Sequence, residues 1–233
     1  MTKVTAQMSI SLDGCYAGPR HDDPATWMES REAAAFFRVT RWAAAAMAWR
    51  ERQGLAGGEQ SVNSRLIEET FDRAGAYVMG RRMADGGEVP WGEEPPFRAP
   101  VFVVTHRERE TLHRRGGTSF TYVTDGIERA VELAREAAGE KDVQVAGGGS
   151  LVRQALEHGL VDELDLHVAP VLIGAGMRLL DVDLPVKEGL ELTLDEVIET
   201  PEMLHLRYRV GERERLVLDD RGGALDISTG EWT

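Results

Sequence analysis

The sequence predicts an α/β protein with a mainly parallel central sheet and helices on both faces of that sheet. Through residue 160, short apolar runs rich in β-branched residues alternate with helix-compatible segments, which is the pattern of repeated strand–helix–strand units. From residue 164 onward, strand-like runs follow one another without helices, which favours antiparallel strands at a sheet edge. The length of 233 residues suits one sizeable core, so we expect a single domain over residues 1–210 and a C-terminal extension over 211–233.

The elements are expected in the following order. The first strand covers residues 4–11 and ends in the Asp13-Gly14 turn, and residues 29–52 are alanine-rich and helix-prone. The other expected strands are 76–79, 101–105, 120–123, the run from 143, 164–170, 190–200 and 203–210. The other expected helices are one through Arg73 capped by Asn63 or Ser64, 127–138 capped by Thr124 or Asp125, and 151–158 capped by Ser150. Residues 80–100 read as a loop with room for one helical turn, and the tail forms either a hairpin around Arg221-Gly222-Gly223 or a loose end.

Composition excludes several classes of function. No apolar run approaches the length of a membrane span, and the N-terminus lacks the layout of a signal peptide. The single cysteine, Cys15, excludes an internal disulfide and fits a cytoplasmic location. A net charge of −13 argues against a nucleic-acid partner. The histidines show no metal-ligand spacing, so no metal is expected.

The most informative segment is residues 143–150, Val-Gln-Val-Ala-Gly-Gly-Gly-Ser. Three glycines between a buried strand and a helix remove every Cβ where the backbone must approach something closely. The N–H groups of the first helical turn then point at one spot, which suits a phosphate or diphosphate. Packing alone would also explain these glycines, but the ligand interpretation is favoured because three glycines in a row cost much chain entropy.

Six motifs occur in order between residue 3 and about residue 210. They are Met8-Ser9-Ile10-Ser11-Leu12-Asp13-Gly14 with Ala17-Gly18-Pro19, Val78-Met79-Gly80-Arg81-Arg82, Val103-Val104-Thr105-His106, Val123-Thr124-Asp125-Gly126, Gly147-Gly148-Gly149-Ser150 and His167-Val168-Ala169-Pro170-Val171-Leu172-Ile173-Gly174. With them the chain resembles the bacterial dihydrofolate-reductase-like proteins, a group that includes the reductase half of the bifunctional riboflavin-biosynthesis deaminase-reductase. The resemblance implies a dihydrofolate-reductase-like three-layer fold, with antiparallel C-terminal strands at the edge of a mainly parallel sheet.

The resemblance also implies NADPH as the cofactor, bound across the carboxyl ends of the parallel strands. The backbone of Ala6 and Gln7 would meet the nicotinamide carboxamide. The diphosphate would be held by Gly147, Gly148, Gly149 and Ser150. The turn of Gly80, Arg81 and Arg82 would meet the diphosphate or the 2′-phosphate, with Thr105, His106 and Arg107 around the adenosine end. Met83 stands where the family usually has a threonine, which removes one hydroxyl contact.

The implied reaction is hydride transfer to a C=N or C=O carbon of a small heterocyclic (pterin- or pyrimidine-like) or ring-opened substrate. It resembles the reaction of 5-amino-6-(5-phosphoribosylamino)uracil reductase. The catalytic candidates are Asp13, which is also explained as a turn former, and Glu32 in the first helix. His167 reads as a core or dimer-interface histidine, and surplus apolar residues in the last strands predict a homodimer.

Two other functions stay open on the sequence alone. The first is a dinucleotide-binding redox sensor or interaction module without turnover, which would keep the glycine run and lack a proton donor. The second is an enzyme for another phosphorylated ligand, such as a sugar nucleotide. All of these functions share the glycine run, so the sequence alone does not separate them.

Overall fold

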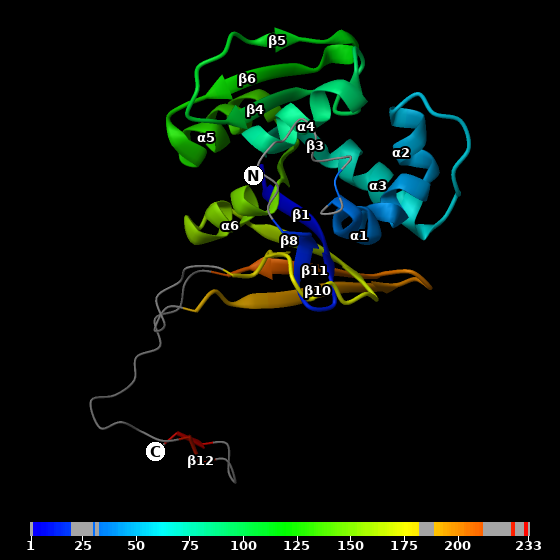
Figure 1. Cartoon of the computed structure of the whole chain (residues 1–233). Coiled ribbons are helices and arrows are strands. Elements are labelled where there is room, and N and C mark those ends of the chain that lie inside the picture. The colour runs from blue at the N-terminus through cyan, green and yellow to red at the C-terminus, as the bar shows by residue number, and fades with distance from the viewer. Residues whose placement is uncertain are drawn as a thin grey trace.

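The computed structural model describes residues 2–19, 30, 33–181, 189–211, 225–226 and 231–232. It contains a nine-stranded sheet with helices on both faces, which confirms the predicted fold class (Figure 1). The strands of this sheet are β1 (Val4–Ser11), β3 (Ala74–Gly80), β4 (Pro100–Val104), β5 (Leu112–His113), β6 (Ser119–Val123), β7 (Asp142–Gly147), β8 (Glu163–Ala169), β10 (Leu192–Glu199) and β11 (Leu204–Val210). The helices are α1 (Ala33–Ala45), α2 (Met47–Arg52), α3 (Val62–Arg73), α4 (Arg81–Trp91), α5 (Gly126–Ala138), α6 (Gly149–Glu157) and the short 3-10 helix η2 (Arg115–Gly117).

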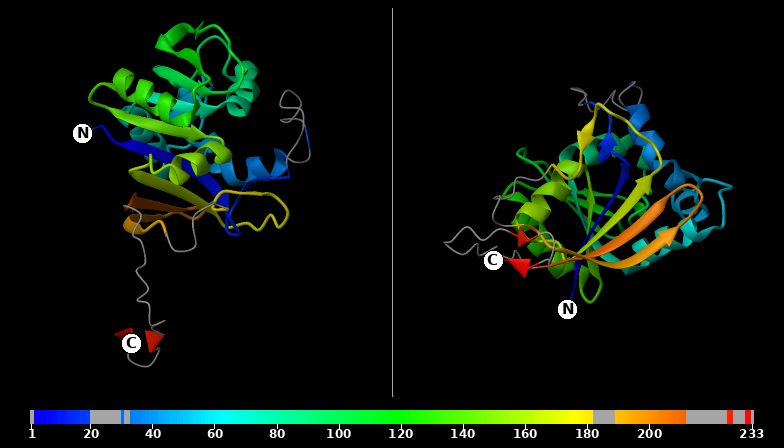
Figure 2. Two further views of the ribbon diagram at one scale, coloured as in Figure 1. Left: turned by 90° about the vertical axis from the view of Figure 1, so that its left-hand side faces the viewer. Right: turned by 90° about the horizontal axis from the view of Figure 1, so that it is seen from below.

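The strand order across the sheet is β10-β11-β8-β1-β7-β3-β4-β6-β5. The six strands from β8 to β6 are parallel, so their carboxyl ends share one edge of the sheet. The predicted antiparallel edge is confirmed, because β10 and β11 pair antiparallel with each other and β11 pairs antiparallel with β8 (Figure 2). The short strand β5 adds an antiparallel edge on the other side that the sequence did not predict.

Each face of the sheet has its own hydrophobic core. Buried residues of α5 and α6 pack on one face with Val4, Ala6 and Ile10 of β1. Buried residues of α1, α3 and α4 pack on the other face with Tyr77 and Met79 of β3. On β1 this second face carries Gln7 and Ser9, which are bonded to polar or aromatic neighbours rather than packed in an apolar core.

Helix α4 corrects the expectation that residues 80–100 form a loop. The helix begins directly after β3 and buries Ala84 and Gly87, in spite of two glycines and Pro90 near its end. A Cβ on Gly87 would lie 2.3 Å from the ring of Trp91, so the glycine lets this ring fold back onto the helix. Tertiary packing therefore outweighs the low helix propensity of glycine.

The helix starts also differ from expectation. The α3 cap is Ser61, whose side chain accepts the N–H of Ser64, rather than Asn63 or Ser64. Asp125 does occupy the N-cap position of α5, without a side-chain cap bond. Helix α6 begins at Gly149, so Ser150 lies inside the helix and does not cap it. The described part of the helix expected over residues 29–52 is two helices, because Ala46 has an extended backbone between α1 and α2. Residues 29, 31 and 32 of that range lie outside the described residues.

Two short antiparallel pairs lie outside the main sheet. The strands β2 (Cys15–Ala17) and β9 (Met177–Arg178) pair with each other, as do β12 (Leu225–Asp226) and β13 (Glu231–Trp232). The expected Arg221–Gly223 turn falls outside the described residues, and the division at residue 210 stays a prediction. None of the described helices is long and apolar enough to cross a membrane.

Candidate functional site

Two helix N-termini meet at the carboxyl edge of the sheet. Helix α4 follows Gly80 at the end of β3, and helix α6 follows Gly148 at the end of β7. A Cβ built on Gly80 would lie 3.7 Å from the amide nitrogen of Gly148, so the two starts are adjacent. Neither N-cap residue makes a side-chain cap bond. In α6 the N–H groups of Leu151 and Val152 donate to the carbonyl of Gly148, at 2.8 and 3.3 Å, so the N–H groups of Gly149 and Ser150 are the ones that can meet an anion. With the first turn of α4 beside them, the two helix dipoles would reinforce each other at one anion.

The three consecutive glycines have different reasons to be glycine. Gly147 has a φ of 114°, and the Gly147–Gly148 peptide is cis. A Cβ on Gly149 would lie 2.3 Å from the ring of Tyr16. Gly148 has an ordinary φ of −65°, and no heavy atom lies within 4 Å of the position of its Cβ. Packing and backbone conformation therefore explain Gly147 and Gly149, whereas Gly148 is the glycine that a ligand would require.

The first strand diverges from β7 at the predicted nicotinamide position. The ladder between β1 and β7 ends at the pair Ala6–Val145, whereas β1 stays paired with β8 up to Ser11. Ala6 is therefore inside the sheet, and Gln7 is the first residue beyond the β7 ladder. The side chain of Gln7 is held on both sides, because its Oε1 accepts the Nε2–H of Gln144 at 3.0 Å and its Nε2 lies 2.6 Å from Nε2 of His167.

The structure brings Arg81 of the predicted phosphate turn together with Thr105 and Arg107 of the predicted adenosine end. The Nη1 of Arg81 donates to Oγ1 of Thr105 at 3.4 Å, and the same oxygen accepts the N–H of Arg107 at 3.1 Å. Arg81 is already in an ion pair, since its Nε lies 2.8 and 2.7 Å from the two carboxylate oxygens of Asp85. The sequence prediction missed Asp85, because the i,i+4 spacing from Arg81 has meaning only on a helix. The other two predicted side chains, Arg82 and His106, are exposed.

The structure describes one of the two predicted catalytic residues, Asp13. Asp13 lies in the turn after β1, where its carboxylate accepts bonds from the hydroxyl of Ser11 and the N–H groups of Ile173 and Gly174. These donors, Ser11 foremost, hold the pKa of Asp13 well below its usual range. A carboxylate held ionised in this way is a poor proton donor, and a catalytic role for Asp13 stays a prediction. Glu32 lies outside the described residues.

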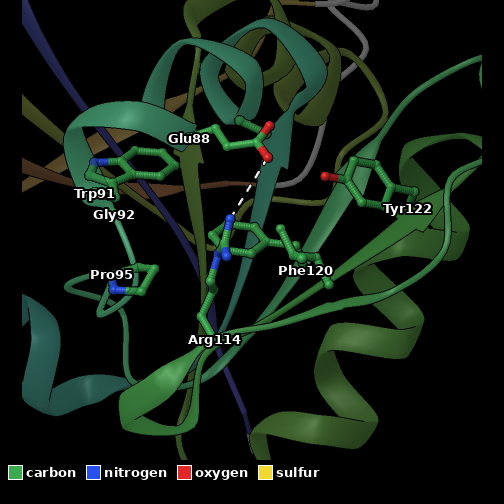
Figure 3. Close-up of a pocket in the computed structure, with 9 residues that line it drawn as sticks. Glu88, Trp91, Gly92, Pro95, Arg114, Phe120 and Tyr122 are labelled. Atoms are coloured by element: carbon green, nitrogen blue, oxygen red, sulfur yellow. Dashed lines mark ion pairs between the residues drawn. The ribbon is translucent and has the colours of Figure 1, made fainter.

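A shallow depression of about 270 Å³, including open solvent, lies between α4, β5 and β6 (Figure 3). Glu88 and Arg114 face each other across it, 3.8 Å apart, with Trp91 on one side and Phe120 on the other. Glu88 also pairs with Arg109 at 3.0 Å. The arginines here are therefore paired within the protein, and this depression does not include the glycine run.

A line of hydrogen-bonded polar side chains crosses the sheet on the α1 and α3 side. It joins, in order, Gln144, Gln7, His167, His205, Asn63 and Glu202. Trp42 packs on both histidine rings at 4.5 and 4.9 Å, and its Nε1–H donates to Ser9. His167 is buried, as the core interpretation expected. The line of hydrogen bonds connects Gln7 to Asn63 of helix α3. The only sequence signal for this line of hydrogen bonds was the polar residues that alternate along β1 and β8.

Among the described residues, no group of three or more His, Cys, Asp and Glu side chains could hold a metal ion.

The first comparison with known proteins concerns the sequence. The family model described as RibD C-terminal domain matches residues 2–206. The curated protein YyaP of Bacillus subtilis (strain 168), itself uncharacterized, is 27% identical over 123 residues. That match covers 50% of this chain and 63% of YyaP, so less than two thirds of that relative is spanned.

Solved structures share the fold. A Shewanella sp. PV-4 protein named for riboflavin biosynthesis aligns with a TM-score of 0.63 at 17% identity, over 91% of this chain and 100% of that one. The RibD protein of Acinetobacter baumannii aligns with a TM-score of 0.54 at 17% identity, over 91% of this chain and 59% of that one. At such low identity these likenesses concern the fold alone.

Proposed function

The chain belongs to the RibD C-terminal domain family, which confirms the resemblance of its motifs, and on this basis we propose that it is an NADPH-dependent reductase. Its substrate would be a small heterocyclic, pterin- or pyrimidine-like, or ring-opened compound with a C=N or C=O group. The reaction would be related to that of 5-amino-6-(5-phosphoribosylamino)uracil reductase. A cytoplasmic location fits a chain whose single cysteine is a buried thiol.

The meeting of the α4 and α6 N-termini at Gly80 and Gly148 carries this proposal. Gly148 has an open Cβ position and an ordinary φ, and no side chain caps the N–H groups of Gly149 and Ser150 that follow it. These residues fit a diphosphate, because the backbone can approach it closely and the helix dipoles favour its charge. NADPH would supply the hydride when bound, while the protein would align the reacting carbons and exclude water.

The 2′-phosphate would be met by Arg81 with Thr105 and the N–H groups after β4, with Arg82, His106 and Arg107 around it. A guanidinium suits a phosphate because it offers two parallel donors. The carboxylate of Asp85 competes for the same guanidinium, so it would set how strongly the 2′-phosphate is preferred. The backbone of Ala6 and Gln7, at the point where β1 leaves β7, would meet the nicotinamide carboxamide.

We also propose a homodimer that uses the outer sheet strands. Leu192, Leu194 and Val197 of β10 are 37, 50 and 51% exposed. They lie on one face of the sheet, because their partners on β11 are Val210, Tyr208 and Leu206 and a bulge shifts the register between Leu194 and Glu196. An exposed apolar face on a two-stranded edge is suited to a self-complementary contact about a twofold axis.

The proposal is tested with the full chain by titrating NADPH and then following its oxidation with a panel of pterins, pyrimidinones, quinones and small carbonyls. Tight binding together with oxidation by one class of compound supports the reductase. Binding without oxidation favours a dinucleotide sensor. A different phosphorylated compound in the mass spectrum of the purified protein, with no affinity for NADPH, would favour an enzyme for a ligand such as a sugar nucleotide.

A further inference from the structure

Two loops join into one unit at the carboxyl ends of β1 and β8. The first loop follows β1 and contains β2, and the second covers residues 170–179 and contains β9. The N–H of Leu12 donates to the carbonyl of Val171, and the N–H of Leu179 donates to the carbonyl of Gly14, both at 2.9 Å. Together with the β2–β9 pairing, these bonds bind the loops along their length.

The side chain of Asp13 lies at the centre of this unit. Its Oδ1 accepts the hydroxyl of Ser11 at 2.6 Å and the N–H of Ile173 at 3.0 Å, and its Oδ2 accepts the N–H of Gly174 at 2.7 Å. Its backbone carbonyl accepts Nη1–H of Arg178 at 2.6 Å. One residue thus connects the end of β1 with Ile173, Gly174 and Arg178 of the second loop.

The unit carries Tyr16 to the start of helix α6. A Cβ on Gly149 would lie 2.3, 2.6 and 2.7 Å from three ring carbons of Tyr16, so the ring lies directly on the first turn of the helix. The hydroxyl of Tyr16 donates to Sδ of Met177 in the second loop at 3.4 Å. The ring is therefore held between the second loop and Gly149, one residue from the open Gly148.

We propose that Asp13 is a positioning residue for the nucleotide site, which it shapes by fastening the two loops so that the Tyr16 ring forms a wall beside Gly148. This inference rests on the proposed function for the identity of the ligand. A wall that is already in place spares the nucleotide the entropy cost of ordering a loop, so its loss lowers affinity. Asp13 itself transfers no proton in this role.

The test is a double-mutant cycle between Asp13 and Tyr16, read out as the Kd for NADPH. Asp13→Asn keeps one acceptor but turns an NH₂ group toward an N–H donor, so at least one loop bond is lost. The Kd should rise about tenfold, which corresponds to the loss of about one bond to a charged group. In a Tyr16→Ala background the same change should raise the Kd less than about twofold, because the wall is already gone.

Asp162→Asn is the matched control. Its Oδ2 accepts the N–H of Val4 at 2.7 Å, at the opposite, amino-terminal edge of the sheet. This variant should lower the melting temperature and leave the Kd for NADPH unchanged. Amide hydrogen exchange of Ile173 and Gly174 should become faster in Asp13→Asn and stay slow in Asp162→Asn.

The outcomes separate this inference from the proposed function. If the wild-type protein binds NADPH and Asp13→Asn binds it equally well, the positioning role is wrong while the proposed function stands. An equal loss of affinity with and without the Tyr16 ring would also overturn it, because Asp13 would then act by another route. If the wild-type protein binds no NADPH, both proposals are wrong.

Discussion

The Nδ1 atoms of His167 on β8 and His205 on β11 lie 2.7 Å apart, so a single proton lies between the two rings. The carboxylate of Glu202 sets the donors and acceptors along the line of hydrogen bonds from Glu202 to Gln7. This carboxylate can only accept, so it faces the amide NH₂ of Asn63. Asn63 then accepts Nε2–H of His205, whose Nδ1 accepts the proton of His167. Both imidazoles are thus neutral, and His167 accepts its last bond from Gln7.

This arrangement predicts acid sensitivity of the fold. Burial lowers the pKa of His205 to about 4, and burial with His205 and Arg207 nearby lowers the pKa of His167 well below its usual value. Unfolded histidines take up protons near pH 6.5. Between pH 6.5 and about 4 the unfolded state therefore binds more protons than the folded state, and stability falls as the pH falls.

His205→Gln should reduce the loss of stability at acid pH, because glutamine offers one acceptor and one donor and does not titrate. The slope of unfolding free energy against pH, measured by urea denaturation, should fall by up to about 1.4 kcal/mol per pH unit, the value for one proton. An unaltered slope in His205→Gln would contradict the proposed protonation states.

Gly148 and Gly149 should respond in opposite ways to a side chain. Gly148→Val should lower NADPH affinity by more than about tenfold, since a branched side chain would stand where backbone N–H groups meet oxygen. Its melting temperature without ligand should change little, because the Cβ position is open and φ is ordinary.

Gly149→Ala should instead destabilise the protein through the clash with Tyr16. Overpacking costs about 1–3 kcal/mol, which is a fall of roughly 2–12 °C in melting temperature for a chain of this size. Combination with Tyr16→Ala should relieve much of that fall. A Gly148→Val protein that unfolds readily yet binds NADPH normally would contradict the assignment of Gly148 to the ligand.

The ion pair of Arg81 and Asp85 should control the choice between NADPH and NADH. The wild-type protein should prefer NADPH by at least about tenfold, because a charge-assisted bond contributes about 1.5–3 kcal/mol. Arg81→Gln should abolish most of that preference. Asp85→Asn should strengthen it, since a carboxylate 2.7 Å from the guanidinium competes with the phosphate.

Glu88→Gln provides the control for this pair. Glu88 lies on the same helix and pairs with Arg109 in the same way, but farther from the helix start. Its replacement should leave the ratio of the two dissociation constants unchanged in calorimetric titrations. Equal affinity of the wild-type protein for NADPH and NADH would remove the 2′-phosphate assignment of Arg81.

The exposed apolar residues of β10 should mediate dimerisation. Light scattering at micromolar concentration should give twice the chain mass of 25.7 kDa. Leu194→Glu should shift the protein toward a monomer, because the symmetric contact would bring two added charges together. Val89→Glu, at an isolated residue of α4 that is 88% exposed, should not change the mass. A monomeric wild-type protein would refute this surface as an interface.

The sequence alone determined the features that depend on neighbouring residues. Apolar runs separated by helical segments specified the parallel sheet, because periodicity of side chains decides which local structure can bury them. The loss of that alternation after residue 164 marked the antiparallel edge. The glycine run identified the end of β7 as a site of close approach, since three missing side chains are visible without a fold.

Tertiary structure decided what depends on residues distant in the chain. Asp13 bonds to Ile173 and Gly174 about 160 residues away, and His167 bonds to His205 38 residues away. No local pattern in the sequence predicts either contact. Helix α4 forms against the local preference of its glycines because Ala84 packs in the core and Gly87 packs under the ring of Trp91. Only that helix places Asp85 against Arg81. The identity of each group was in the sequence, but its hydrogen-bond partners, and hence its charge and role, depended on the packing of the whole sheet.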